Sequence, residues 1–144
     1  IKDRFNLIIG DPSAEKAKIE FGTAYKNTDL MRGQIKGIDA TTGLPKSIDL
    51  TSDDILNALD GSLKIIIDAV HKTLEKIPPE LVSDIIHEGI VLAGGGALIR
   101  DFDKRLLEEV KVPIKIAPDP LLTIAKGGEQ IIASRDFLER VRLS

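Results

Sequence analysis

The sequence has no cysteine and no tryptophan, and aromatic residues make up only 3% of it. Without cysteine there can be no disulfide framework and no thiolate metal site. The two histidines, His71 and His87, lie too far apart in sequence for the spacing of metal ligands. We therefore expect no metal site in this chain and interpret both histidines as structural or solvent-facing.

Long apolar runs and dense clusters of positive charge are also missing. The apolar runs are a few residues long, far short of the ~20 residues that a membrane-spanning helix needs. The first residues, "IKDRFNLIIG", do not have the layout of a signal peptide. Twenty basic and 23 acidic residues give a net charge of -3. We expect no transmembrane segment in this chain and no nucleic-acid partner.

The composition that remains is that of a globular chain. Its 144 residues are 42% hydrophobic and 30% charged, which is enough apolar material for a buried core and unlike a disordered chain. The chain does not begin with methionine, and its first residues have the pattern of the end of a helix. We expect a fragment of a larger protein.

The first part of the chain predicts a helix, a hairpin and a long helix. Pro12 and Gly22 bound a short helix over about 12–21. Residues 29–51 contain two runs of extended-chain formers joined by "ATTG", which predicts an antiparallel hairpin. The long helix, capped by Thr51 or Ser52, runs to about residue 76. Its apolar residues recur with helical spacing: Ile55, Leu56, Leu59, Leu63, Ile66, Ile67, Val70, Leu74 and Ile77. Pro78 interrupts it, and Pro79 suits the first position of a short helix through about His87.

From residue 89 the pattern alternates between strands and helices. The expected elements are a strand over 89–93, a helix over 97–110, a strand over 113–117 and a helix over 120–141. This succession is typical of a parallel sheet covered by helices. The fold class is therefore α/β, with a smaller α+β part formed by the hairpin and the long helix.

Three consecutive glycines follow the strand over 89–93, in "IVLAGGGALIRDF". Such a turn exposes backbone N–H groups and carries no side chains, so a flat or anionic part of a ligand can lie against it. The alternative is a tight turn in which strand and helix pack closely. The segment has neither the lysine and hydroxyl of a P-loop nor the spacing of a dinucleotide fingerprint. The residues alone leave both interpretations open.

Four long stretches of the sequence resemble the C-terminal half of the MreB family of bacterial actins. They are "AEKAKIEFG", "GIDATTGLPKSIDLT", "TLEKIPPELVSDIIHEGIVLAGGGALIRDFD" and "PDPLLTIAKGG". The resemblance implies an actin-like, ribonuclease H-like half-domain. It also implies that residues 12–87 form the small helix-hairpin-helix subdomain, and that residues 1–11 and 88–144 belong to the larger α/β nucleotide-binding subdomain.

The resemblance further implies an adenosine site. Its residues would be Gly94, Gly95 and Gly96 as a backbone surface, Leu98 against the base, and Glu15 and Lys18 at the ribose and adenine. A carboxylate can accept hydrogen bonds from ribose hydroxyls, and an ammonium can donate to them. Judged from the residues alone, Glu15 and Lys18 fit an exposed ion pair on one helix face better than a ligand site.

For the whole protein, the resemblance implies a cytoskeletal ATPase that polymerises with ATP and magnesium at the cytoplasmic face of the inner membrane and maintains rod shape. Implied partners are further subunits and the membrane-embedded cell-wall elongation machinery with its adaptor. This sequence lacks the family's phosphate hairpins, so we assign no catalytic residue and expect no ATP hydrolysis by this chain alone. Two alternatives stay open: a non-polymerising interaction module of the same superfamily, and half of a sugar-kinase-like enzyme.

Overall fold

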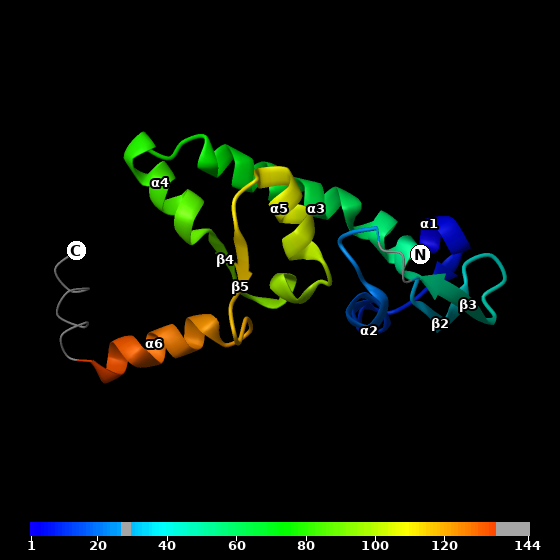
Figure 1. The fold of residues 1–144 in the computed structure, drawn as a ribbon. Helices are drawn as coiled ribbons and strands as arrows, with labels where there is room; N and C mark the ends of the chain where they lie inside the picture. The colour runs from blue at the N-terminus through cyan, green and yellow to red at the C-terminus, as the bar shows by residue number, and fades with distance from the viewer. Residues whose placement is uncertain (27–29, 135–144) are drawn as a thin grey trace.

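The longest element is helix α3 (Ser52–Leu74), and two hydrophobic clusters pack against it, one with the N-terminal elements and one with α5 and the parallel strands (Figure 1). The computed structural model describes residues 1–26 and 30–134. Helix α3 begins with the predicted Thr51 cap. The Thr51 hydroxyl accepts from the Asp54 amide, and the Asp54 carboxylate accepts from the Thr51 amide at 2.8 Å. This capping box satisfies two backbone donors at the start of the helix.

The N-terminal elements form a three-stranded antiparallel sheet with helices beside it. They are α1 (Lys2–Phe5), β1 (Leu7–Ile8), α2 (Asp11–Phe21), β2 (Arg32–Asp39) and β3 (Pro45–Thr51), with strand order β1-β2-β3. The predicted short helix and hairpin are confirmed. Strand β1 was not predicted, because two residues are too short to show a period. It pairs with β2 and so extends the hairpin sheet, while the division into subdomains stays a prediction.

Helix α2 is fixed on this sheet by two small residues. Ala17 is buried in a cluster with residues of the sheet and of α3, namely Leu7, Ile35, Leu50 and Ile55. The ring of Phe21, at the end of α2, lies against Gly33 of β2, where a Cβ would be only 1.9 Å from the ring. The sheet can therefore approach α2 this closely only because position 33 has no side chain.

The C-terminal elements confirm the predicted alternation of strands and helices. They are α4 (Pro79–Glu88), β4 (Ile90–Leu92), the 3-10 helix η1 (Gly95–Leu98), α5 (Phe102–Val110), β5 (Ile114–Ile116) and α6 (Thr123–Ala133). Strands β4 and β5 are parallel neighbours, with Ile90 beside Ile114. Pro79 is the first residue of α4, as expected. The α/β class with a small hairpin sheet is thus confirmed.

The predicted starts of two helices were wrong. The glycines do not lead directly into an α-helix over 97–110: they enter η1, and α5 begins only at Phe102. Asp101, with φ 59°, adopts the left-handed conformation and interrupts helical geometry between the two elements. The last predicted helix, over 120–141, is seen as α6, which begins at Thr123 rather than at residue 120 because residues 120–122 form a turn; its part from residue 135 lies outside the described residues.

A second hydrophobic cluster joins α3 and α5 to the parallel strands. Its buried members come from α3, α5 and the segment after α2: Ala24, Leu63, Ile67, Phe102, Leu106 and Val110. Leu59 packs against both clusters, so α3 connects them. Over residues 1–26 and 30–134, no helix is long and apolar enough to cross a membrane.

Candidate functional site

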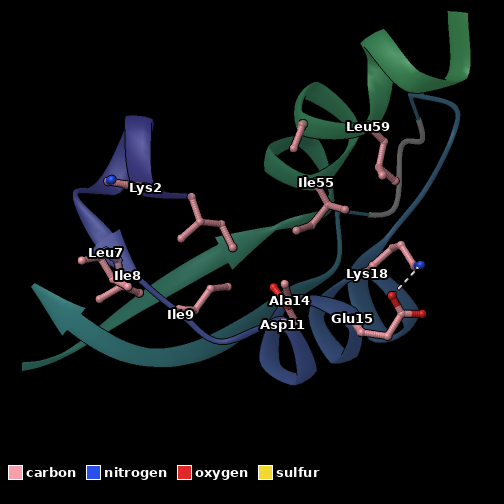
Figure 2. Close-up of a pocket in the computed structure, with 12 residues that line it drawn as sticks. Lys2, Leu7, Ile8, Ile9, Asp11, Ala14, Glu15, Lys18, Ile55 and Leu59 are labelled. Atoms are coloured by element: carbon pink, nitrogen blue, oxygen red, sulfur yellow. Dashed lines mark ion pairs between the residues drawn. The ribbon is translucent and has the colours of Figure 1, made fainter. Parts of the chain in front are cut away.

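Glu15 and Lys18 lie on one face of α2 and form an ion pair, with 2.7 Å between Lys18 Nζ and Glu15 Oε2 (Figure 2). Their side chains are 58% and 37% exposed. An ion pair this exposed contributes only a few tenths of a kcal/mol to stability, so both side chains can exchange partners at little cost. The helix spacing predicted from the sequence is confirmed, while the role of the pair in ligand binding stays a prediction.

The pair borders a cavity of about 550 Å³. The lining comes from α1, β1, α2, α3 and the residues between them: Ile1, Lys2, Leu7, Ile8, Ile9, Asp11, Ala14, Glu15, Lys18, Ile55, Ala58 and Leu59. Figure 2 shows Ile55 and Leu59 on α3 at one side of the cavity and the ion pair on α2 at another. A cavity of this size, with mostly apolar walls and a few charged groups, matches the usual character of small-molecule sites.

The glycine segment has one position that requires glycine and two that do not. Gly94 has φ 80° and ψ 175°, a conformation essentially confined to glycine, and its N–H donates to the Pro120 carbonyl at 2.7 Å. Gly95 and Gly96 are exposed and have no positive φ. Among the described residues, a Cβ at Gly96 would meet no heavy atom within 4 Å, and one at Gly95 would meet only Leu121, at 3.6 Å.

These contacts bear on the alternative of a tight turn. Ordinary van der Waals separation at Gly95 and open space at Gly96 mean that no close packing among the described residues requires glycine at either position. The backbone there is left accessible from outside the chain. Gly61, Gly127 and Gly128 are open in the same way, so these surroundings permit a ligand to lie against Gly95 and Gly96 without requiring one.

Leu98, at the end of η1, lies 56% exposed beside another, smaller cavity. This cavity has a volume of about 180 Å³ and is lined by Leu98, Asp119, Pro120, Leu121 and Leu122. Glu15 and Lys18 instead line the cavity between α2 and α3. Glu15 and Lys18 therefore line one cavity and Leu98 lines another, while Gly94 to Gly96 line neither of the two, and the geometry of a joint site stays a prediction.

The two groups are nevertheless connected through the backbone. Thr23, shortly after α2, pairs as an isolated parallel bridge with Arg100, shortly after η1. The Ala24 N–H donates to the Arg100 carbonyl at 2.8 Å. Thr23 is buried, and its hydroxyl donates to the Tyr25 carbonyl at 2.9 Å. The segment that follows the ion pair therefore lies beside the segment that follows the glycines.

The largely buried, positively charged side chain of Arg105 also holds these two segments together. The Arg105 guanidinium, on α5, donates from Nη2 to Asp60 Oδ1 on α3 at 2.6 Å and from Nη1 to the Ala24 carbonyl at 3.2 Å. Two hydrogen bonds lower the pKa of Asp60 below its usual value: the one from Lys64 has the larger effect, and the one from Arg105 adds to it. Sequence reasoning missed Arg105, because helical periodicity does not reveal which distant residue a charged side chain will contact.

The family model described as MreB/Mbl protein matches residues 1–140 of the chain. The chain belongs to the MreB/Mbl family. It is 39% identical over 137 residues to the cell shape-determining protein MreB of Escherichia coli K12, a match that covers 95% of this chain and 40% of the relative. The chain thus spans less than half the length of this MreB/Mbl relative.

Solved structures agree with this assignment. The crystal structure of MreB5 of Spiroplasma citri bound to AMPPNP matches with a TM-score of 0.89 and 35% identity, over 99% of this chain and 42% of that one. A MamK double helical filament matches with a TM-score of 0.67 and 22% identity, over 83% of this chain and 37% of that one, which is a likeness of fold. The expected actin-like half is confirmed, and MreB/Mbl membership favours the cytoskeletal interpretation over a sugar-kinase-like half.

Proposed function

We propose that this chain supplies the adenosine side of the nucleotide site in a longer MreB-type, actin-like ATPase. The observation that carries the proposal is the accessible backbone at Gly95 and Gly96, where neither conformation nor packing among the described residues calls for glycine. The charged pair beside an apolar cavity on α2 supports it. So does the close structural match to an MreB5 bound to AMPPNP.

In this proposal each side chain has a distinct task. The Glu15 carboxylate accepts hydrogen bonds from the ribose hydroxyls, and the Lys18 ammonium donates to the ribose and adenine. The bare backbone of Gly94 to Gly96 receives the flat face of the nucleoside, with Leu98 against the base. The described residues hold no group of three or more acidic, histidine or cysteine side chains suited to a metal ion. We assign the magnesium and phosphate contacts to the remaining length of the protein.

We further propose that the intact protein assembles into filaments at the cytoplasmic face of the inner membrane and maintains cell shape. The name of the E. coli relative and the filament of the MamK neighbour support this assignment. The membrane-embedded cell-wall elongation machinery and its adaptor are the proposed partners. Light scattering of the intact protein with ATP and magnesium tests assembly, and the absence of any ATP-dependent rise would contradict it.

Nucleotide binding is tested by titrating ATP into the intact protein and its Glu15→Gln variant. A hydrogen bond to a charged group contributes about 1.5–3 kcal/mol when its loss leaves a partner unsatisfied, so the Kd should rise roughly 10- to 150-fold. The matched control is Glu20→Gln, because Glu20 forms an ion pair with Lys16 on the same helix and lines a different pocket. Equal affinities for the wild type and Glu15→Gln would refute the assignment of Glu15.

A further inference from the structure

Arg105 is the point at which three segments of the chain meet. Its side chain is only 13% exposed, and it reaches from α5 to Asp60 on α3 and to the Ala24 carbonyl after α2. The guanidinium is planar and presents its N–H groups in fixed directions, so contact with both partners restrains their separation. A lysine, with a single ammonium on a flexible stem, restrains such a pair less.

Both backbone polar groups of Ala24 form hydrogen bonds to the region around α5. Its N–H donates to the Arg100 carbonyl at 2.8 Å, and its carbonyl accepts from Arg105 at 3.2 Å. The residue is buried in the cluster that joins α3 and α5. Ala24 lies three residues after the end of α2, and Arg100 lies two residues after the end of η1. One anchored residue therefore connects the helix of Glu15 and Lys18 to the glycine segment.

Asp60 has a second cationic partner that provides an internal comparison. Lys64 lies 2.8 Å from Asp60, four residues along the same helix, and is itself largely exposed. This pair lies within α3 and connects no other element. Loss of Lys64 removes one charge from Asp60 without releasing Ala24, whereas loss of Arg105 does both.

We propose that Arg105 is a positioning residue for the adenosine site. By linking Ala24 to Asp60 it sets the place of α2, and hence of Glu15 and Lys18, relative to the segment Gly94–Leu98. This inference rests on the function proposed above. The partners of Arg105 are Asp60 and Ala24, not Glu15, Lys18 or the segment Gly94–Leu98. It therefore acts on the affinity for ATP through the segment after α2.

The test compares two ligands in the intact protein: ATP, and inorganic tripolyphosphate, which lacks the adenosine. In Arg105→Gln the Kd for ATP should rise at least about threefold, the scale expected when a residue away from a ligand modulates its site. The Kd for tripolyphosphate should stay within about twofold of the wild-type value, because this ligand has no adenosine and so does not contact the proposed adenosine-binding residues. Lys64→Gln should leave both Kd values unchanged, and Arg105→Lys should have an intermediate effect on ATP.

The outcomes separate this inference from the proposed function. If Glu15→Gln weakens ATP binding and Arg105→Gln does not, the positioning role is refuted and the adenosine site stands. If neither variant changes ATP affinity, the assignment of Glu15 fails, and the inference about Arg105 fails with it. An equal loss for ATP and tripolyphosphate in Arg105→Gln would mean a purely structural role and would also overturn the inference. Should Arg105→Gln not fold, Arg105→Lys decides by the same comparison of ligands.

Discussion

Alanine at Gly95 or Gly96 should separate folding from nucleotide binding. Neither position has a positive φ, and an added Cβ meets at most an ordinary contact, at 3.6 Å from Leu121. Replacing glycine by alanine at a compatible position narrows the unfolded ensemble and stabilises a protein by about 0.4–1 kcal/mol. We therefore expect the thermal stability of either variant without nucleotide to be unchanged or slightly raised.

The same methyl groups should obstruct a nucleoside lying on this backbone. Forcing an additional methyl into an occupied contact costs about 1–3 kcal/mol, which corresponds to a roughly 5- to 150-fold increase in Kd. The assay is a titration of the intact protein with ATP, for the wild type, Gly95→Ala and Gly96→Ala, together with thermal unfolding of each protein alone. The diagnostic result is weaker binding in a protein of undiminished stability.

Gly94→Ala serves as the contrasting variant. Its φ of 80° with ψ 175° is a conformation that costs a residue with a side chain about 1–3 kcal/mol, so this variant should lose stability. If Gly95→Ala and Gly96→Ala both bind ATP as the wild type does, the ligand does not lie on this backbone. If instead they lose as much stability as Gly94→Ala, the glycines are needed for packing and the reasoning is refuted.

Three further predictions concern stability, measured by urea unfolding of the chain. Leu106→Ala, at a fully buried position, should cost about 2–5 kcal/mol, and Leu107→Ala, at its 45% exposed neighbour, much less; equal losses would contradict the assigned core. Thr51→Ala removes the hydroxyl that accepts from the Asp54 amide, while the backbone N–H of residue 51 can still donate to the Asp54 carboxylate; it should cost about 0.5–2 kcal/mol, and no loss would show that the cap is not formed. Hydrogen bonds from Lys46 and from neighbouring backbone amides hold the pKa of Asp39 at about 2, below its ordinary value of 3.8. Since the folded pKa is the lower one, this stabilisation is present above about pH 4 and is lost as the pH falls towards 2, so Asp39→Asn should reduce the pH dependence in that window; an unchanged profile would refute it.

The elements with a long period or a clear boundary residue could be predicted from the sequence. The stripe of apolar residues gave α3 to within two residues of its end, and Thr51 and Pro79 marked the starts of α3 and α4 because their effects act within one turn. Strand β1 could not be predicted, because its only evidence is its pairing with a strand more than twenty residues away. Boundaries that depend on tertiary pairing leave no local pattern.

In the candidate site too, features set by local spacing could be predicted, whereas features set by tertiary contacts could not. The spacing of Glu15 and Lys18 placed both on one face of a helix, and the structure has them paired at 2.7 Å. The break at Asp101 was missed, because aspartate adopts the left-handed conformation only where the surrounding structure calls for it. Arg105 was missed for a related reason: its two partners lie 45 and 81 residues away in sequence.

The sequence does not distinguish Gly33 from Gly96. Only their surroundings in the structure show whether a contact within the chain requires glycine. At Gly33 the ring of Phe21 occupies the place of a side chain, so a contact within the chain fully accounts for the residue. At Gly96 no described atom lies within 4 Å of that place, and the backbone conformation is open to any residue. A glycine that is required by a contact within the chain is explained by folding alone. Gly61, Gly127 and Gly128 have equally open surroundings, so openness at Gly96 permits a ligand to approach but does not by itself identify one. The ATP affinity of Gly96→Ala, compared with its stability, decides whether a nucleotide lies there.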